Sequence, residues 1–154
     1  MKVLTLLFSG LVATTLAKIK KDPVVPGDIS TYVPVHPMAD NSTYGNIDQI
    51  EISHQHIDWF VNWTSNQFQG SILFDMVVKT NNVLYIQLDS WNNTIDSVQL
   101  LPGGSAMRAT LGSGNIPVVD NPLVWEVKYP NPTCGDVLVI QLPHAYNRGG
   151  YFSI

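Results

Sequence analysis

The chain has 154 residues, of which 13% are charged, and eight basic against twelve acidic side chains give a formal net charge of −4 at pH 7. This sparse, mildly acidic charge excludes the clustered basic face that is typical of nucleic-acid binding, so nucleic acid is not an expected partner. Cys134 is the only cysteine, so no disulfide can form within one copy. We interpret its side chain as a partly buried small hydrophobe.

Residues 1–17 have the pattern of a secretory signal peptide. Lys2 precedes an apolar run, residues 3–16, which the small residue Ala17 follows. The run is shorter than the roughly 20 apolar residues of a membrane-spanning helix, and later apolar runs are interrupted by polar residues. We therefore expect a secreted, extracellular protein with no membrane span. Its candidate glycosylation sites are the three Asn-x-Ser/Thr sequences at Asn41, Asn62 and Asn92.

Residues 18–40 are expected to form an extended arm, because four prolines fix the backbone there and remove amide donors. From residue 50 onward, β-branched and aromatic residues alternate with polar residues, Gly and Pro. This pattern predicts antiparallel strands at 50–64, 67–79, 83–89, 94–101, 106–111, 123–129 and 136–142.

The predicted fold is all-β, either an antiparallel β-sandwich or a saddle-shaped β-sheet of about seven or more strands. The first two strands should form a hairpin with its turn at Ser65-Asn66 and a bulge or bend near His54 to His56. The strand 136–142 is almost continuously apolar, which predicts a central place in its sheet.

Five short segments carry a family resemblance through their order and spacing. They are Ile-Ser-His-Gln-His-Ile-Asp at 52–58, Phe-Gln-Gly-Ser-Ile at 68–72, Leu-Tyr-Ile-Gln-Leu-Asp-Ser at 84–90, Thr-Ile-Asp-Ser-Val at 94–98 and Gly-Asp-Val-Leu-Val-Ile-Gln-Leu at 135–142. In this order they resemble the N-terminal domain of the aminopeptidase-N type zinc metallopeptidases, in particular the branch that contains leukotriene-A hydrolase and aminopeptidase B.

The resemblance implies a β-domain over residues 41–150, which in the family lies in front of a thermolysin-like zinc domain. Residues 151–154 are then interpreted as a truncated end. Much of that branch is cytosolic, so the apparent signal peptide favours a secreted offshoot or a truncated secreted aminopeptidase.

The motifs that make this family catalytic are absent from the sequence. It contains neither His-Glu-x-x-His, which places two zinc ligands and a general base on one helix face, nor Gly-x-Met-Glu-Asn, which holds the peptide amino terminus. We therefore expect no catalytic residue, no metal ligand and no cofactor in this chain, the zinc belonging to full-length relatives. His54 and His56 share a strand face, but a zinc site needs three or four ligands, so we interpret them as hydrogen-bonded strand residues.

Apolar residues on one face of the first strand are candidates for a protein interface. They are Ile57, Trp59, Val61 and Trp63. The leading hypothesis is a non-catalytic N-terminal β-domain that packs against a zinc aminopeptidase catalytic domain and helps to wall its substrate cleft. The alternative is a free-standing secreted β-sandwich module that binds another extracellular protein or a glycan.

A weaker third hypothesis is a small hydrolase that uses a pair of carboxylates. Its candidates are Asp75, Asp89, Asp96 and Glu126. Such a pair has to lie about 5 to 10 Å apart in a cleft, and the sequence spacing does not place any two of them together.

Overall fold

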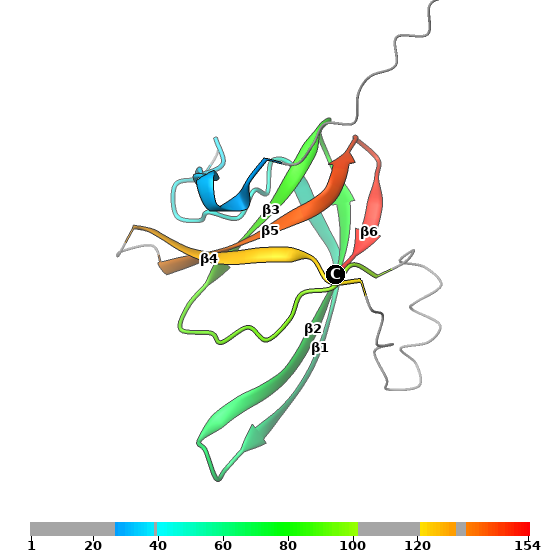
Figure 1. Ribbon diagram of the computed structural model, residues 1–154. Helices are drawn as coiled ribbons and strands as arrows, with labels where there is room; N and C mark the ends of the chain where they lie inside the picture. The colour runs from blue at the N-terminus through cyan, green and yellow to red at the C-terminus, as the bar shows by residue number, and fades with distance from the viewer. Residues whose placement is uncertain (1–26, 39, 102–120, 132–134) are drawn as a thin grey trace, which may run out of the picture.

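The computed structural model describes residues 27–38, 40–101, 121–131 and 135–154. They form two antiparallel three-stranded sheets, which confirms the prediction of an all-β chain (Figure 1). The first sheet, in the order β1-β2-β6, consists of β1 (Ile50–Asn62), β2 (Gln67–Val78) and β6 (Tyr151–Ser153). The second, in the order β3-β5-β4, consists of β3 (Val83–Ser90), β4 (Val124–Asn131) and β5 (Gly135–Tyr146).

The described residues contain six strands, fewer than the seven or more that the sequence predicts. The predicted strand 94–101 is wrong, because this segment makes only isolated bridges at Gln99 and Leu101. Its alternating pattern has another cause, since Ile95, Val98 and Leu100 pack their side chains against the core without a continuous ladder partner. The predicted strand 106–111, the signal peptide 1–17 and Cys134 lie outside the described residues.

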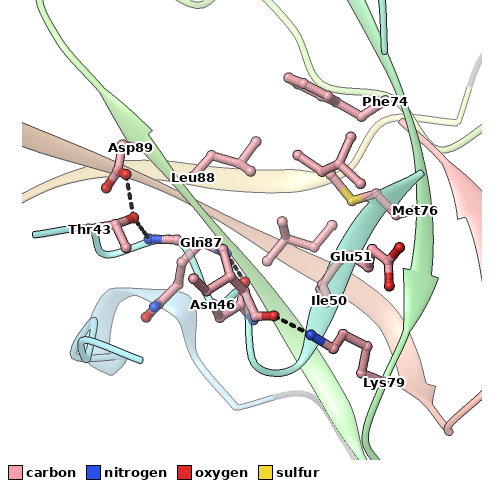
Figure 2. Close-up of a pocket in the computed structure, with 14 residues that line it drawn as sticks. Thr43, Asn46, Ile50, Glu51, Phe74, Met76, Lys79, Gln87, Leu88 and Asp89 are labelled. Atoms are coloured by element: carbon pink, nitrogen blue, oxygen red, sulfur yellow. Dashed lines mark hydrogen bonds between the residues drawn. The ribbon is translucent and has the colours of Figure 1, made fainter. Parts of the chain in front are cut away.

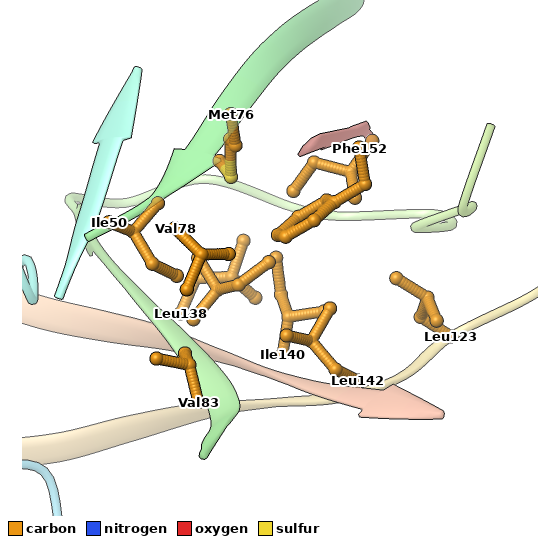
Figure 3. Close-up of a cluster of buried hydrophobic side chains, with 11 residues drawn as sticks. Ile50, Met76, Val78, Val83, Leu123, Leu138, Ile140, Leu142 and Phe152 are labelled. Atoms are coloured by element: carbon orange, nitrogen blue, oxygen red, sulfur yellow. The ribbon is translucent and has the colours of Figure 1, made fainter. Parts of the chain in front are cut away.

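The main apolar core lies between the two sheets (Figure 3). Its buried members are Ile50, Met76, Val78, Val83, Ile86, Leu123, Leu138, Ile140, Leu142, Phe152 and Ile154. β5 is the central strand of its sheet, as predicted, and it is buried on both faces. The side chains of Val137 and Val139 point away from the main core and pack under Ile29 and Tyr44, which explains the almost continuous apolar run.

The segment between residues 27 and 49 crosses the outer face of the second sheet (Figure 1). It begins with a 3-10 helix, η1 (Ile29–Thr31), whose first turn is capped by the Asp28 carboxylate. The buried Gln87 of β3 holds the segment in place. Its side-chain oxygen accepts hydrogen bonds from the Tyr32 hydroxyl and the Val35 amide, and its nitrogen donates to the carbonyls of Val35 and Tyr44.

Residues 151–154, interpreted from sequence as a truncated end, are an integral part of the first sheet. β6 pairs with β2, and the Phe152 and Ile154 side chains are buried in the core. The Ser153 hydroxyl donates a 2.6 Å hydrogen bond to the buried Asp75 carboxylate.

The attachment of residues 27–49 should weaken at alkaline pH. Burial, and to a lesser degree the neighbouring Tyr85, raises the pKa of Tyr32 above its ordinary value. The raised pKa means that the neutral Tyr32 side chain stabilises the folded state. This contribution to stability is complete below about pH 10, where tyrosine is neutral in the unfolded chain, and is lost as the pH rises through the folded-state pKa. Denaturant unfolding from pH 8 to 11 should show this loss.

Tyr146, whose pKa burial also raises, titrates in the same direction, so the informative quantity is a difference between variants. Tyr32→Phe keeps the ring but lacks the ionising hydroxyl, and its stability should fall less steeply above pH 10 than that of the wild type. Equal slopes for the two proteins would contradict the prediction.

Candidate interaction surface

A β-bulge at Ser53 determines which side chains share a face of the β1–β2 hairpin. The pairing steps from Ile52 with Met76 to His54 with Asp75, so Ser53 is an extra residue on β1. This confirms the predicted irregularity, slightly earlier in the chain than expected. An extra residue inverts the alternation. Even-numbered residues of β1 before the bulge therefore share a face with odd-numbered residues after it.

As a result, one face that is apolar except for Gln55 runs along the whole hairpin. Near the base it carries Met76 and Val78, which are buried in the core. Further out, the cross-strand pairs are Ile57 with Ile72, Trp59 with Gly70 and Val61 with Phe68. We call these six residues the distal apolar face. The hairpin projects beyond the second sheet (Figure 1), so the second sheet covers the base of this surface and leaves the distal part open.

The distal apolar face is both exposed and uncharged. Trp59 and Phe68 are 63% and 69% exposed, and their rings pack against each other with centroids 5.4 Å apart. Residues 59–74 contain no Asp, Glu, Lys, Arg or His. Most residues that point to the opposite side are polar, including Asp58, Asn62 and Gln69. An aromatic surface without charge is characteristic of the buried centre of a protein interface.

Three of the four predicted interface residues, Ile57, Trp59 and Val61, lie on this face. Trp63 follows the end of β1 and is 81% exposed in the turn. There the Asn62 side chain accepts hydrogen bonds from the Thr64 and Ser65 amides. Phe68 and Ile72 were not predicted as interface residues. Their apolar alternation is visible in the sequence, but only the strand register assigns them to the same face.

At the hairpin base, a cleft of about 480 Å³ opens between the sheets (Figure 2). Apolar side chains from β1, β2 and β3 line much of it, and several polar side chains at its rim are bonded within the chain. Asp89 accepts hydrogen bonds from the Thr43 hydroxyl and the Tyr44 amide, and the Lys79 ammonium donates to the Ile47 carbonyl at 2.9 Å. Across the described residues, every buried side-chain nitrogen or oxygen has a partner. The lining of the cleft is therefore mainly apolar, with polar groups at its rim.

Three of the four carboxylates considered from the sequence are engaged in separate contacts. Glu126 forms an ion pair with Lys128 at 3.1 Å. Asp75 accepts a hydrogen bond from the Ser153 hydroxyl, and Asp89 accepts one from the Thr43 hydroxyl. His54 and His56 lie on the polar side of β1. The described ranges contain no group of three or more His, Cys, Asp or Glu residues placed to hold a metal ion.

The three glycosylation sequences all lie in described segments. Asn41 and Asn92 are exposed, and Asn62 is half-buried at the end of β1. No helix in the parts of the chain that the structure describes is long and apolar enough to cross a membrane.

No protein-family model matches this chain, and no curated protein matches it.

The close approach of the two strands at Gly70 gives a test of the distal apolar face. A Cβ at this position would collide with the Asp58 carbonyl oxygen and lie 2.8 Å from the Trp59 Cβ. Gly70→Ala should therefore push the strands apart and loosen the hairpin beyond residue 57, because backbone atoms cannot move aside as a flexible side chain can. Hydrogen exchange measured by mass spectrometry should be faster in residues 57–72 and unchanged in β5.

The control is Ser71→Ala at the neighbouring, exposed position, which removes a hydroxyl without adding bulk. Unchanged exchange in Gly70→Ala, or equal acceleration in both variants, would contradict the proposed packing.

Proposed function

We propose that this chain is a secreted, non-catalytic β-domain that docks onto a larger protein through the distal apolar face. The observation that carries the proposal is the continuity of this face with the core. The same surface of the hairpin is buried at its base and exposed further out, and apart from Gln55 its side chains are apolar in both parts. Exposed aromatic residues in a contiguous patch mark contact sites, because water leaves them favourably on binding.

The magnitude of the exposed surface supports a stable complex. A fully buried aromatic side chain accounts for about 150–250 Å², so the five side chains of the face together with Trp63 expose on the order of 600 Å² of apolar surface. A standard protein interface buries about 800 Å² per partner, including its polar rim. The distal apolar face together with Trp63 therefore has the size of an interface centre.

The proposed partner is the catalytic domain of a zinc aminopeptidase. The support for this class is the order of the five sequence segments that resemble the N-terminal domain of the aminopeptidase-N type family. In this proposal the two sheets belong to a larger saddle-shaped or sandwich architecture, and the domain helps to wall the substrate cleft of its partner. The metal and its ligands then belong to the partner.

The exposed indole rings of Trp59 and Trp63 favour a second candidate, a free-standing extracellular module that binds a glycan or another protein. Flat, exposed indole rings can contact either a glycan or a protein, because an indole presents an apolar face and a polar N–H at its edge.

The proposal is tested by binding of the mature chain to a separately produced catalytic domain from the leukotriene-A hydrolase and aminopeptidase B branch. Trp59→Ala should weaken binding about 30-fold, the loss typical of a central aromatic residue in an interface. Trp91→Ala is the matched control, because Trp91 is 71% exposed but directly follows β3 and lies beside Gly135 of the second sheet. Absence of binding by the wild type, or equal loss in both variants, would refute the proposal. Binding to a glycan array that Trp59→Ala abolishes would favour the second candidate.

The mature chain alone should not hydrolyse aminoacyl anilides when zinc is added, and the complex with the catalytic domain should. Turnover by the isolated chain that a chelator removes would contradict the non-catalytic assignment.

A further inference from the structure

The outer edge of β1 is a second surface of the hairpin, distinct from the distal apolar face. β1 is the edge strand of its sheet, and among the strands that the structure describes it pairs with β2 alone. Its thirteen residues contain no Pro, Lys or Arg. Proteins usually protect an exposed edge with such residues, because its free amide and carbonyl groups otherwise pair with a strand from another chain.

We propose that two copies of this chain pair through β1 in an antiparallel arrangement centred on Ile57. The argument for a second copy is that β1 is complementary to itself in this register. Antiparallel pairing about Ile57 places His56 opposite Asp58 of the other copy, and symmetry forms this pair twice. It also places His54 opposite Phe60 and sets Ile57 opposite itself.

Neighbouring registers are less favourable. Centring the pairs on His56 keeps a His54–Asp58 pair but sets two imidazoles opposite each other, and centring them on Asp58 places two carboxylates opposite each other. Two carboxylates directly opposite each other across a pair of strands are destabilising, whereas an imidazole that donates to a carboxylate and a β-branched pair both stabilise. The paired residues 54–60 also lie beyond the bulge at Ser53, where the pairing of β1 with β2 is regular.

The shape of the molecule permits this pairing. The hairpin projects from the rest of the protein (Figure 1), so antiparallel pairing places the two bodies at opposite ends of a shared six-stranded sheet in the order β6-β2-β1-β1-β2-β6. The two-fold axis is perpendicular to that sheet, and the distal apolar faces of both copies lie on the same side. The pairing therefore goes beyond the proposed function and leaves its surface accessible.

A symmetric cross-link tests the register in the full mature chain, in a Cys134→Ser background that leaves one thiol per copy. In antiparallel pairs the facing Cα atoms lie about 4.5–5.5 Å apart, within the range for a disulfide. Ile57→Cys should therefore form a disulfide-linked dimer on mild oxidation. Val61→Cys is the matched control, because this residue lies on the same strand and face with similar exposure, 37% against 42%. Its two copies would be roughly 27 Å apart at about 3.4 Å per residue, and should not cross-link.

A charge exchange tests the pairing without oxidation. In the dimer, His56→Asp places a carboxylate opposite Asp58 of the other copy, and symmetry forms this repulsive pair twice. The dimer dissociation constant measured by sedimentation equilibrium should therefore rise about tenfold. Adding Asp58→His restores opposite partners and should recover most of the dimer.

Wild-type protein that remains monomeric at all concentrations measured would overturn the proposal. So would equal cross-linking of the two cysteine variants, or a double variant no better than His56→Asp. Failure of the dimer leaves binding by Trp59 to a catalytic domain unaffected, so the two proposals fail separately.

Discussion

The extra residue at Ser53 is the constraint on which the arrangement of the hairpin depends. Without it, the alternation of β1 would place Ile57, Trp59 and Val61 on the opposite side from Ile50 and Ile52. A one-residue change of register moves every side chain of a strand to the other face. The bulge therefore allows the surface that packs in the core to continue outward as a single apolar face. The Ser53 hydroxyl also donates to the Asp75 carbonyl, which fastens the irregular position to β2.

The two ends of the hairpin differ in what supports them. At the base, the second sheet and β6 bury Met76 and Val78, so the strands form part of a cooperative core. Beyond residue 57, the contacts between the described strands are the pairing of β1 with β2, the packing of Trp59 against Phe68 and a hydrogen bond from Asn62 to Gln69. An isolated two-stranded hairpin is only marginally stable in water. A covering protein would therefore stabilise the distal half of the hairpin more than its base.

Sequence pattern was sufficient where local alternation and tertiary structure agree. The hairpin, its turn, the third strand and the central position of β5 follow from periodicity and turn residues, because each apolar run coincides with a buried strand face. The same reasoning failed at residues 94–101, where Val98 and Leu100 bury their side chains while the backbone lacks a continuous ladder. Periodicity reports which side chains are buried and does not report which backbone groups pair.

The sequence also could not predict the long-range polar contacts or the pairing register of β1 with β2. Nothing in the local pattern around Gln87 indicates that its amide would bind Tyr32, Val35 and Tyr44, more than forty residues away in the chain. The membership of Phe68 and Ile72 in the distal apolar face likewise required the pairing of β2 with β1, since either face of a strand can be apolar in isolation.

Beyond the bulge, one face of β1 is mostly apolar and the other mostly polar, with Gln55 and Phe60 as the exceptions. Asn62 pairs with Gln67 on the polar side, together with Asp58 and Gln69. A glycan attached to Asn62 would therefore extend away from the distal apolar face and leave that surface open to a protein. Because alternation along a strand assigns neighbours to opposite sides, a bulky polar group and an apolar contact can occupy the same narrow hairpin without competing for space.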